Sequence, residues 1–197
     1  MFLCTGNSAR SIFGKYLIRS IGGSRFQSYS AGSFPTGEVN PFAIRVLRDL
    51  YHIDASAARS KGCEEFKGVE FDFVITVCDN ARETCPVWPG QPILAHWGSP
   101  DPALAGGTDA EKFQQFKQVA LQIRRRIESF CALPFDKLDR LRLETLTRDI
   151  GTRKEEAQVE PKASLKTKTV ASKAHFANLR PLKIIRPTAH HSSRRTL

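Results

Sequence analysis

The chain has 197 residues, of which 25% are charged and 41% are hydrophobic, and its formal net charge at pH 7 is +10. This length suffices for one domain with a hydrophobic core plus an appendage. No apolar run approaches the roughly 20 residues of a membrane-spanning helix, and no charged-then-apolar signal segment opens the sequence. We therefore expect a cytoplasmic protein with no membrane partner.

The positive charge is concentrated near the C-terminal end. Residues 1–150 carry 19 Lys and Arg against 17 Asp and Glu, whereas residues 151–197 carry 11 against 3. The latter segment is poor in aromatic residues and rich in Lys, Ser, Thr and Ala, a composition typical of disorder. We expect a catalytic domain over residues 1–135, a peripheral helix over 136–150 and a disordered basic tail over 151–197. No nucleic-acid partner is expected beyond weak contact through the tail.

An apolar stretch at the start of the chain leads into a turn that is typical of anion-binding sites. Met1-Phe2-Leu3 precede residues 4–11, and apolar residues then recur at helical intervals, so the turn joins a strand to a helix. Only three residues precede Cys4, whereas a central strand usually has about five or six. We expect either that the strand starts further upstream or that this protein tolerates a short one.

The strand-to-helix turn has the residues needed to hold a tetrahedral oxyanion. Backbone N–H groups and the helix N-terminus attract an anion, and a planar guanidinium at Arg10 grips two of its oxygens. The same donors stabilise a thiolate, which makes Cys4 the expected nucleophile, with Ser11 placed to donate to it. A nucleotide-binding loop is set aside because Tyr16 follows Lys15 where Ser or Thr is required. The remaining alternative is a buried cysteine in a tight turn. The expected anion ligands are Thr5, Gly6, Asn7, Ser8, Ala9, Arg10 and Ser11.

Further along the chain, strands alternate with helices. Residues 25–31 alternate as a second strand, and Asn40 caps a helix whose first residue is Pro41. A short helical segment is expected near residues 60–66. Residues 71–77 and 92–97 predict two more strands. We expect Thr108 to open the last long helix and residues 138–150 to form a further amphipathic helix. This alternation predicts a parallel sheet covered on both sides.

Ligands of such sheets bind at the carboxyl ends of the strands, where Cys4, Cys78 and Asp101 all fall. Asp101 precedes Pro102 in a rigid turn, from which it would protonate a leaving group; the alternative is a structural aspartate in a proline turn. His96 is expected to make a structural contact near this turn. The three arginines at residues 124–126 are expected to form the solvated face of a helix.

The cysteines indicate thiol chemistry. The chain has five cysteines, and an odd number without a secretion signal argues against a disulfide framework. The spacings of these cysteines fit no zinc pattern, so no bound metal is expected. Cys78 and Cys85 are seven residues apart across a polar loop, which allows disulfide exchange between them; two unrelated thiols are the alternative. Cys63 and Cys131 are expected to be packing residues.

Together these motifs resemble the arsenate reductases of the low-molecular-weight protein tyrosine phosphatase superfamily, over about residues 1–135. The resemblance rests on residues 4–11, Ser30-Ala31-Gly32, Val77-Cys78-Asp79, Cys85-Pro86, and His96-Trp97-Gly98 with Asp101-Pro102. It implies a three-layer α/β/α fold with a four-stranded parallel sheet, and a monomeric enzyme of arsenic resistance. Some members bind potassium through a carboxylate in the first helix; Lys15 stands there instead, so no such cation is expected.

The resemblance also implies a relay of three cysteines. Cys4 attacks arsenate, Cys78 attacks the Cys4–arsenic adduct and releases arsenite, and Cys85 relieves the resulting Cys4–Cys78 disulfide. A Cys78–Cys85 disulfide then remains for an external reductant, either thioredoxin or glutaredoxin with glutathione. No bound cofactor is implied.

Two other functions compete with arsenate reduction. A phosphatase acting on phosphotyrosine or aryl phosphates needs Cys4, Arg10 and Asp101 alone, but neither Cys78 nor Cys85. The region after Asp101 also lacks the tyrosines that phosphotyrosine-specific relatives place there. A sensor of anions or arsenite, with its tail on nucleic acid, needs no general acid, so Asp101 argues against it.

Overall fold

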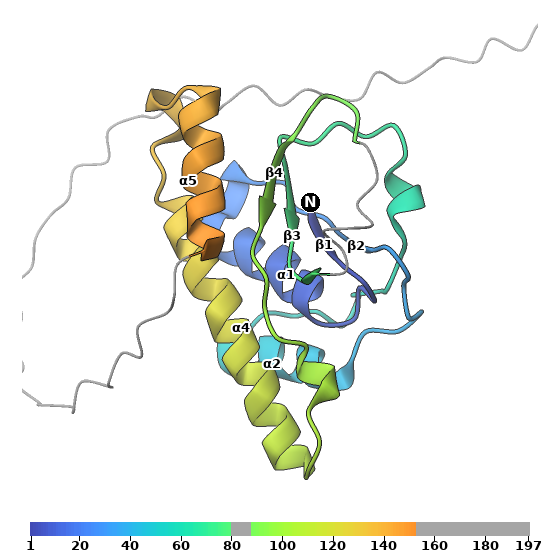
Figure 1. Cartoon of the computed structure of the whole chain (residues 1–197). Helices are drawn as coiled ribbons and strands as arrows, with labels where there is room; N and C mark the ends of the chain where they lie inside the picture. Colours follow the sequence, from blue (N-terminus) through green and yellow to red (C-terminus); the bar gives the residue numbers. More distant parts are fainter. Residues whose placement is uncertain (80–87, 153–197) are drawn as a thin grey trace, which may run out of the picture. The chain divides into compact units, whose positions relative to one another are not determined.

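A four-stranded parallel sheet organises the molecule (Figure 1). The computed structural model describes residues 1–79 and 88–152. The strand order is β2-β1-β3-β4, and Cys4 at the end of β1 lies opposite Gly32 at the end of β2. Because all strands run the same way, their carboxyl ends meet at one edge. The strands are β1 (Phe2–Cys4), β2 (Ser30–Gly32), β3 (Phe73–Thr76) and β4 (Ile93–His96).

Helices with defined caps connect the strands. Asn40 caps α2 by accepting a hydrogen bond from the N–H of Phe42, with Pro41 at the first helical position. Thr108 and Glu111 form a reciprocal capping box at the start of α4. Both caps are where the sequence predicts them. The helices are α1 (Arg10–Gly22), α2 (Pro41–Tyr51), α4 (Asp109–Cys131) and α5 (Arg140–Thr152), with short 3₁₀ turns η1 (Gly23–Arg25), η2 (Cys63–Phe66), η3 (Pro102–Leu104) and η4 (Phe135–Lys137).

The two faces of the sheet bury different clusters, because successive strand residues point to opposite sides. Phe2 and Cys4 join a large cluster with apolar residues of α1, α2 and α4. Met1 and Leu3 join a smaller cluster on the other face. That second cluster includes Ala31, Val74 and Trp88, with Tyr29, Cys63, Phe66 and Phe71 against it.

The last described helix, α5, lies against β4 (Figure 1). The indole N–H of Trp97 donates to the carbonyl of Thr147 at 2.9 Å, and Nε of Arg148 donates to the carbonyl of Leu94 at 3.2 Å. Ile150 is buried. This helix therefore anchors the end of β4 and the residues that follow it.

The fold class expected from the sequence is confirmed, but residues 25–31 are not one continuous strand. Arg25 ends η1 and donates to the carbonyl of Cys131 at 3.1 Å. Phe26 packs against Phe130 and Phe135, with ring centroids 5.6 Å apart in both pairs. Because these side chains bind the segment to the end of α4, strand pairing begins only at Ser30.

Other boundaries move by a few residues. The helical segment expected at 60–66 is the 3₁₀ turn Cys63–Phe66, and the helix expected at 138–150 is Arg140–Thr152. The expected disordered tail lies outside the described residues, apart from the end of α5. None of the helices in the described ranges combines the length and apolar composition needed to cross a lipid bilayer.

Candidate active site

The turn between β1 and α1, residues 4–11, holds the Cys4 sulfur among donors; we call it the anion loop. The N–H of Asn7 donates to Cys4 Sγ at 3.1 Å, and Ser11 Oγ lies 3.0 Å from the same sulfur. Asn7 Nδ2 donates to Ser11 Oγ at 2.8 Å, which leaves the hydroxyl proton to point at the sulfur. Two hydrogen-bond donors, the Asn7 N–H and the Ser11 hydroxyl, are therefore directed at the Cys4 sulfur.

Asn7 explains how the loop keeps its shape. Its backbone φ is +46°, in the left-handed region that Asn tolerates better than most residues. Its fully buried side chain also accepts a hydrogen bond from the N–H of Lys61 at 3.0 Å. The neighbouring carbonyl of Gly6 accepts from Thr36 and Ser60. The loop is thus fixed from both sides before any ligand enters.

Arg10 joins the anion loop to the predicted acid. One terminal nitrogen, Nη2, lies 2.5 Å from Oδ2 of Asp101, and Nη1 donates to the carbonyl of Ser99 at 3.1 Å. The other carboxylate oxygen of Asp101 accepts from the N–H of Ala103 at 3.0 Å, which caps η3. The predicted anion ligand and the predicted acid are therefore in direct contact.

Of the two cysteines predicted to exchange a disulfide, Cys78 lies beside the anion loop. It follows β3 and is buried, and its Sγ lies 3.4 Å from Oγ1 of Thr5. Cys85 lies outside the described residues. The structure therefore brings Cys4, Arg10, Asp101 and Cys78 to one end of the sheet, as their positions after the strands predict.

Two further predictions concern residues around the site. The structural contact expected of His96 is present: its ring nitrogens contact Oγ1 of Thr76 at 2.8 Å and Oδ1 of Asp79 at 3.0 Å. The prediction of three solvated arginines is wrong for Arg126, which is 8% exposed. It lies three residues after Ile123 and four before Phe130, both buried, so helical periodicity already assigned it to the inner face.

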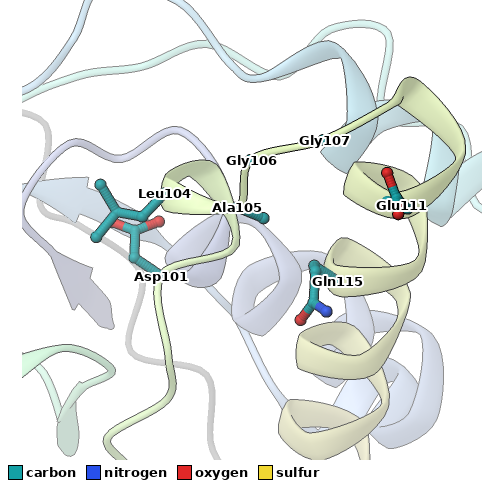
Figure 2. Close-up of a pocket in the computed structure, with 7 residues that line it drawn as sticks. All are labelled: Asp101, Leu104, Ala105, Gly106, Gly107, Glu111 and Gln115. Atoms are coloured by element: carbon teal, nitrogen blue, oxygen red, sulfur yellow. The ribbon is translucent and has the colours of Figure 1, made fainter.

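A pocket of about 510 Å³ lies beside Asp101. Figure 2 shows Asp101 and Leu104 at one end of it, and Glu111 and Gln115 of α4 at the other. Leu104 is 84% exposed. None of the described residues that line this pocket is aromatic, so it offers no ring for stacking a phenyl group.

Positive charge gathers beside the anion loop. Burial lowers the pKa of Lys61 to about 8, and repulsion from Lys15 and Arg59 adds to the effect. Burial also lowers the pKa of Lys15, with Arg19 and Arg59 contributing. In residues 1–79 and 88–152 no three His, Cys, Asp or Glu side chains are grouped to hold a metal ion.

Comparisons with known proteins identify the family of this chain. The family model for low molecular weight phosphotyrosine protein phosphatases matches residues 1–144. The arsenate reductases of Oceanobacillus iheyensis and Halalkalibacterium halodurans are 40% and 38% identical over 129 residues, which cover 66% of this chain and 91% of each relative. A solved structure described as an arsenate reductase in the phosphate binding state is 27% identical with a TM-score of 0.53, and the match covers 67% of this chain and 95% of that one. The chain belongs to the low molecular weight phosphotyrosine protein phosphatase family.

Proposed function

We propose that this protein reduces arsenate to arsenite by a relay of Cys4, Cys78 and Cys85. The observation that carries the proposal is the second thiol at the anion loop, where Cys78 Sγ lies 3.4 Å from Oγ1 of Thr5. A phosphatase of this family type needs one thiol, whereas reduction of arsenic from the +5 to the +3 state needs two electrons, which two thiols supply. The arsenate reductases at 38% and 40% identity support the same activity.

In the first step arsenate binds the backbone N–H groups of the anion loop and the guanidinium of Arg10. The thiolate of Cys4 forms a bond to arsenic, and an arsenate oxygen leaves as water after receiving a proton from Asp101. Arsenic remains in the +5 state in this adduct. The contact between Arg10 and Asp101 places both groups at the anion loop.

In the second step the thiol of Cys78 attacks the Cys4 sulfur, and its proton passes to an oxygen of the departing arsenite. An S–S bond forms, the S–As bond breaks, and its electron pair stays on arsenic, which leaves as arsenite. The thiol of Cys85 then attacks Cys78, so that Cys4 is released and a Cys78–Cys85 disulfide remains. Thioredoxin, or glutaredoxin with glutathione, reduces that disulfide. The enzyme is proposed to act as a cytoplasmic monomer.

Single-turnover reactions without reductant test the relay. Cys85→Ser should release near-stoichiometric arsenite and stop as a Cys4–Cys78 disulfide, whereas Cys78→Ser should release almost none. Cys63→Ser is the matched control, because its Sγ donates to the carbonyl of Gly32 and a serine retains that bond. Mass mapping of the trapped disulfides gives a second measurement. Multiple turnovers with thioredoxin by both relay variants would refute the relay.

Phosphate monoester hydrolysis is the second candidate, because the contact between Arg10 and Asp101 also suits that reaction. Hydrolysis would pass through a Cys4 phosphocysteine and would need no other thiol. Cys78→Ser should then retain any hydrolysis of p-nitrophenyl phosphate while it loses arsenate reduction. A parent protein that hydrolyses this ester but consumes no NADPH with arsenate, thioredoxin and thioredoxin reductase would favour the phosphatase.

A further inference from the structure

Arg126 is a buried charged side chain on α4 that the proposed reaction does not use. Its guanidinium points toward the backbone that follows β4. Nη1 donates to the carbonyl of Trp97 at 2.8 Å and to that of Gly98 at 2.9 Å, and it also lies 3.0 Å from Oγ of Ser99. Burying a guanidinium is costly unless it is hydrogen-bonded, and these three contacts supply acceptors to Nη1.

The backbone held by Arg126 leaves the sheet at this point. Residues 97–99 follow β4, so their carbonyls have no neighbouring strand to pair with and need other donors. The N–H of Trp97 donates to Thr76 at 2.7 Å, and the N–H of Ser99 donates to Val77 at 3.2 Å. Arg126 supplies the donors for the opposite side of the same segment. The segment is therefore fixed between the end of β3 and the C-terminal part of α4.

Ser99 connects this fixed segment to the groups that act on the oxyanion. Its carbonyl accepts from Nη1 of Arg10 at 3.1 Å, and Asp101, two residues later, contacts Nη2 of Arg10. The N–H of Ser99 donates to the carbonyl of Val77, the residue before Cys78. A shift of Ser99 would therefore move the Arg10 fork, the acid and the start of the Cys78 segment together.

We propose that Arg126 is a positioning residue, which holds residues 97–99 so that Ser99 and Asp101 orient the guanidinium of Arg10 toward a bound oxyanion. The inference rests on the proposed function in taking Arg10 and Asp101 as the working groups. Its effect passes through the backbone, because the hydrogen bonds described above join Arg126 to residues 97–99.

The test compares three variants of the full chain by calorimetric titration with inorganic phosphate, well below their unfolding temperatures. Arg126→Gln should weaken phosphate binding about tenfold, as expected when a charged hydrogen-bond donor is lost and Arg10 is no longer held. The phosphate affinity of Arg126→Lys should lie between those of Arg126→Gln and the parent. Its ammonium group can donate three hydrogen bonds in place of those that Nη1 makes. Arg124→Gln is the control on the same helix, since Arg124 is at the surface and pairs with Glu128.

Parental phosphate affinity in a folded Arg126→Gln would overturn the inference, because a purely structural arginine changes stability and not the affinity of the folded state. Ser99→Ala provides a second test that keeps Arg126, and it should weaken phosphate binding by a smaller factor; parental affinity in that variant would also count against the inference. Arsenate turnover is measured in parallel. A parent that binds phosphate without reducing arsenate would refute the proposed function and leave the Arg126 result valid.

Discussion

Gly32 faces the anion loop where no side chain fits, so Gly32→Ala is a direct test of how tightly that loop is held. A Cβ at this position would lie 2.4 Å from the carbonyl oxygen of Thr5 and 3.0 Å from the backbone nitrogen of Asn7. Both are backbone atoms and cannot rotate away. Because ordinary contact begins near 3.4 Å, the loop must move by about 1 Å from Thr5.

The same displacement affects stability and function by different amounts. Overpacking of this kind costs roughly 1–3 kcal/mol of unfolding free energy, which a folded domain survives. A displacement of about 1 Å in a catalytic group costs about 10²-fold in rate. Gly32→Ala should therefore remain folded while its arsenate turnover falls about a hundredfold, and its affinity for phosphate should fall as well.

Urea unfolding, phosphate titration and NADPH-coupled arsenate turnover measure the three quantities. Gly106→Ala is the control, because a Cβ there meets no atom within 4 Å and the backbone φ is not positive. Its stability, phosphate affinity and turnover should match those of the parent. If Gly32→Ala bound phosphate and turned over arsenate like the parent, the anion loop would not need its position against β2.

Three further substitutions probe charge. Arg10→Lys should weaken phosphate binding roughly ten- to a hundredfold, since an ammonium cannot reproduce two parallel bonds; equal titration curves would contradict this. Asp101→Asn should slow arsenate turnover by roughly 10²–10⁴-fold while the cap on Ala103 persists, and an unchanged pH–rate profile would exclude the acid function. Lys61→Met should raise the unfolding free energy at pH 7. Because the folded pKa of Lys61 is about 8 and that of the unfolded chain is 10.5, this gain should shrink as pH rises between those values; a constant difference in urea unfolding across that range would refute it.

Much of this site could be predicted because its signals are local. The caps at Asn40 and Thr108 depend on side chains within three residues, and both helices begin where the sequence places them. The positions of Cys4, Cys78 and Asp101 follow from the direction of parallel strands. These features need no knowledge of which side chains meet across the fold.

The features that could not be predicted depend on contacts between distant residues. Residues 25–29 alternate like a strand, but Phe26 is drawn to Phe130 and Phe135, more than a hundred residues later. Arg126 is the last of three consecutive arginines; its place on the helix assigns it to the inner face, but the acceptors that it meets there depend on the position of the backbone after β4. Asn7 was expected as an anion ligand, while its role in bonding Lys61 required the tertiary structure.

The contact between Arg10 and Asp101 has a consequence for which anions the loop accepts. The Asp101 carboxylate already accepts from one terminal nitrogen of Arg10, so an arriving oxyanion competes with that carboxylate for the guanidinium. Because Asp101 is part of the same chain, its carboxylate competes for Arg10 at an effective concentration of roughly the millimolar range or above. Chloride, with one charge and no paired oxygens, gains little in that competition, whereas a tetrahedral dianion presents two oxygens to the fork. The protein's own carboxylate thus sets a threshold that an anion must exceed in order to bind Arg10, and this threshold favours tetrahedral dianions over chloride.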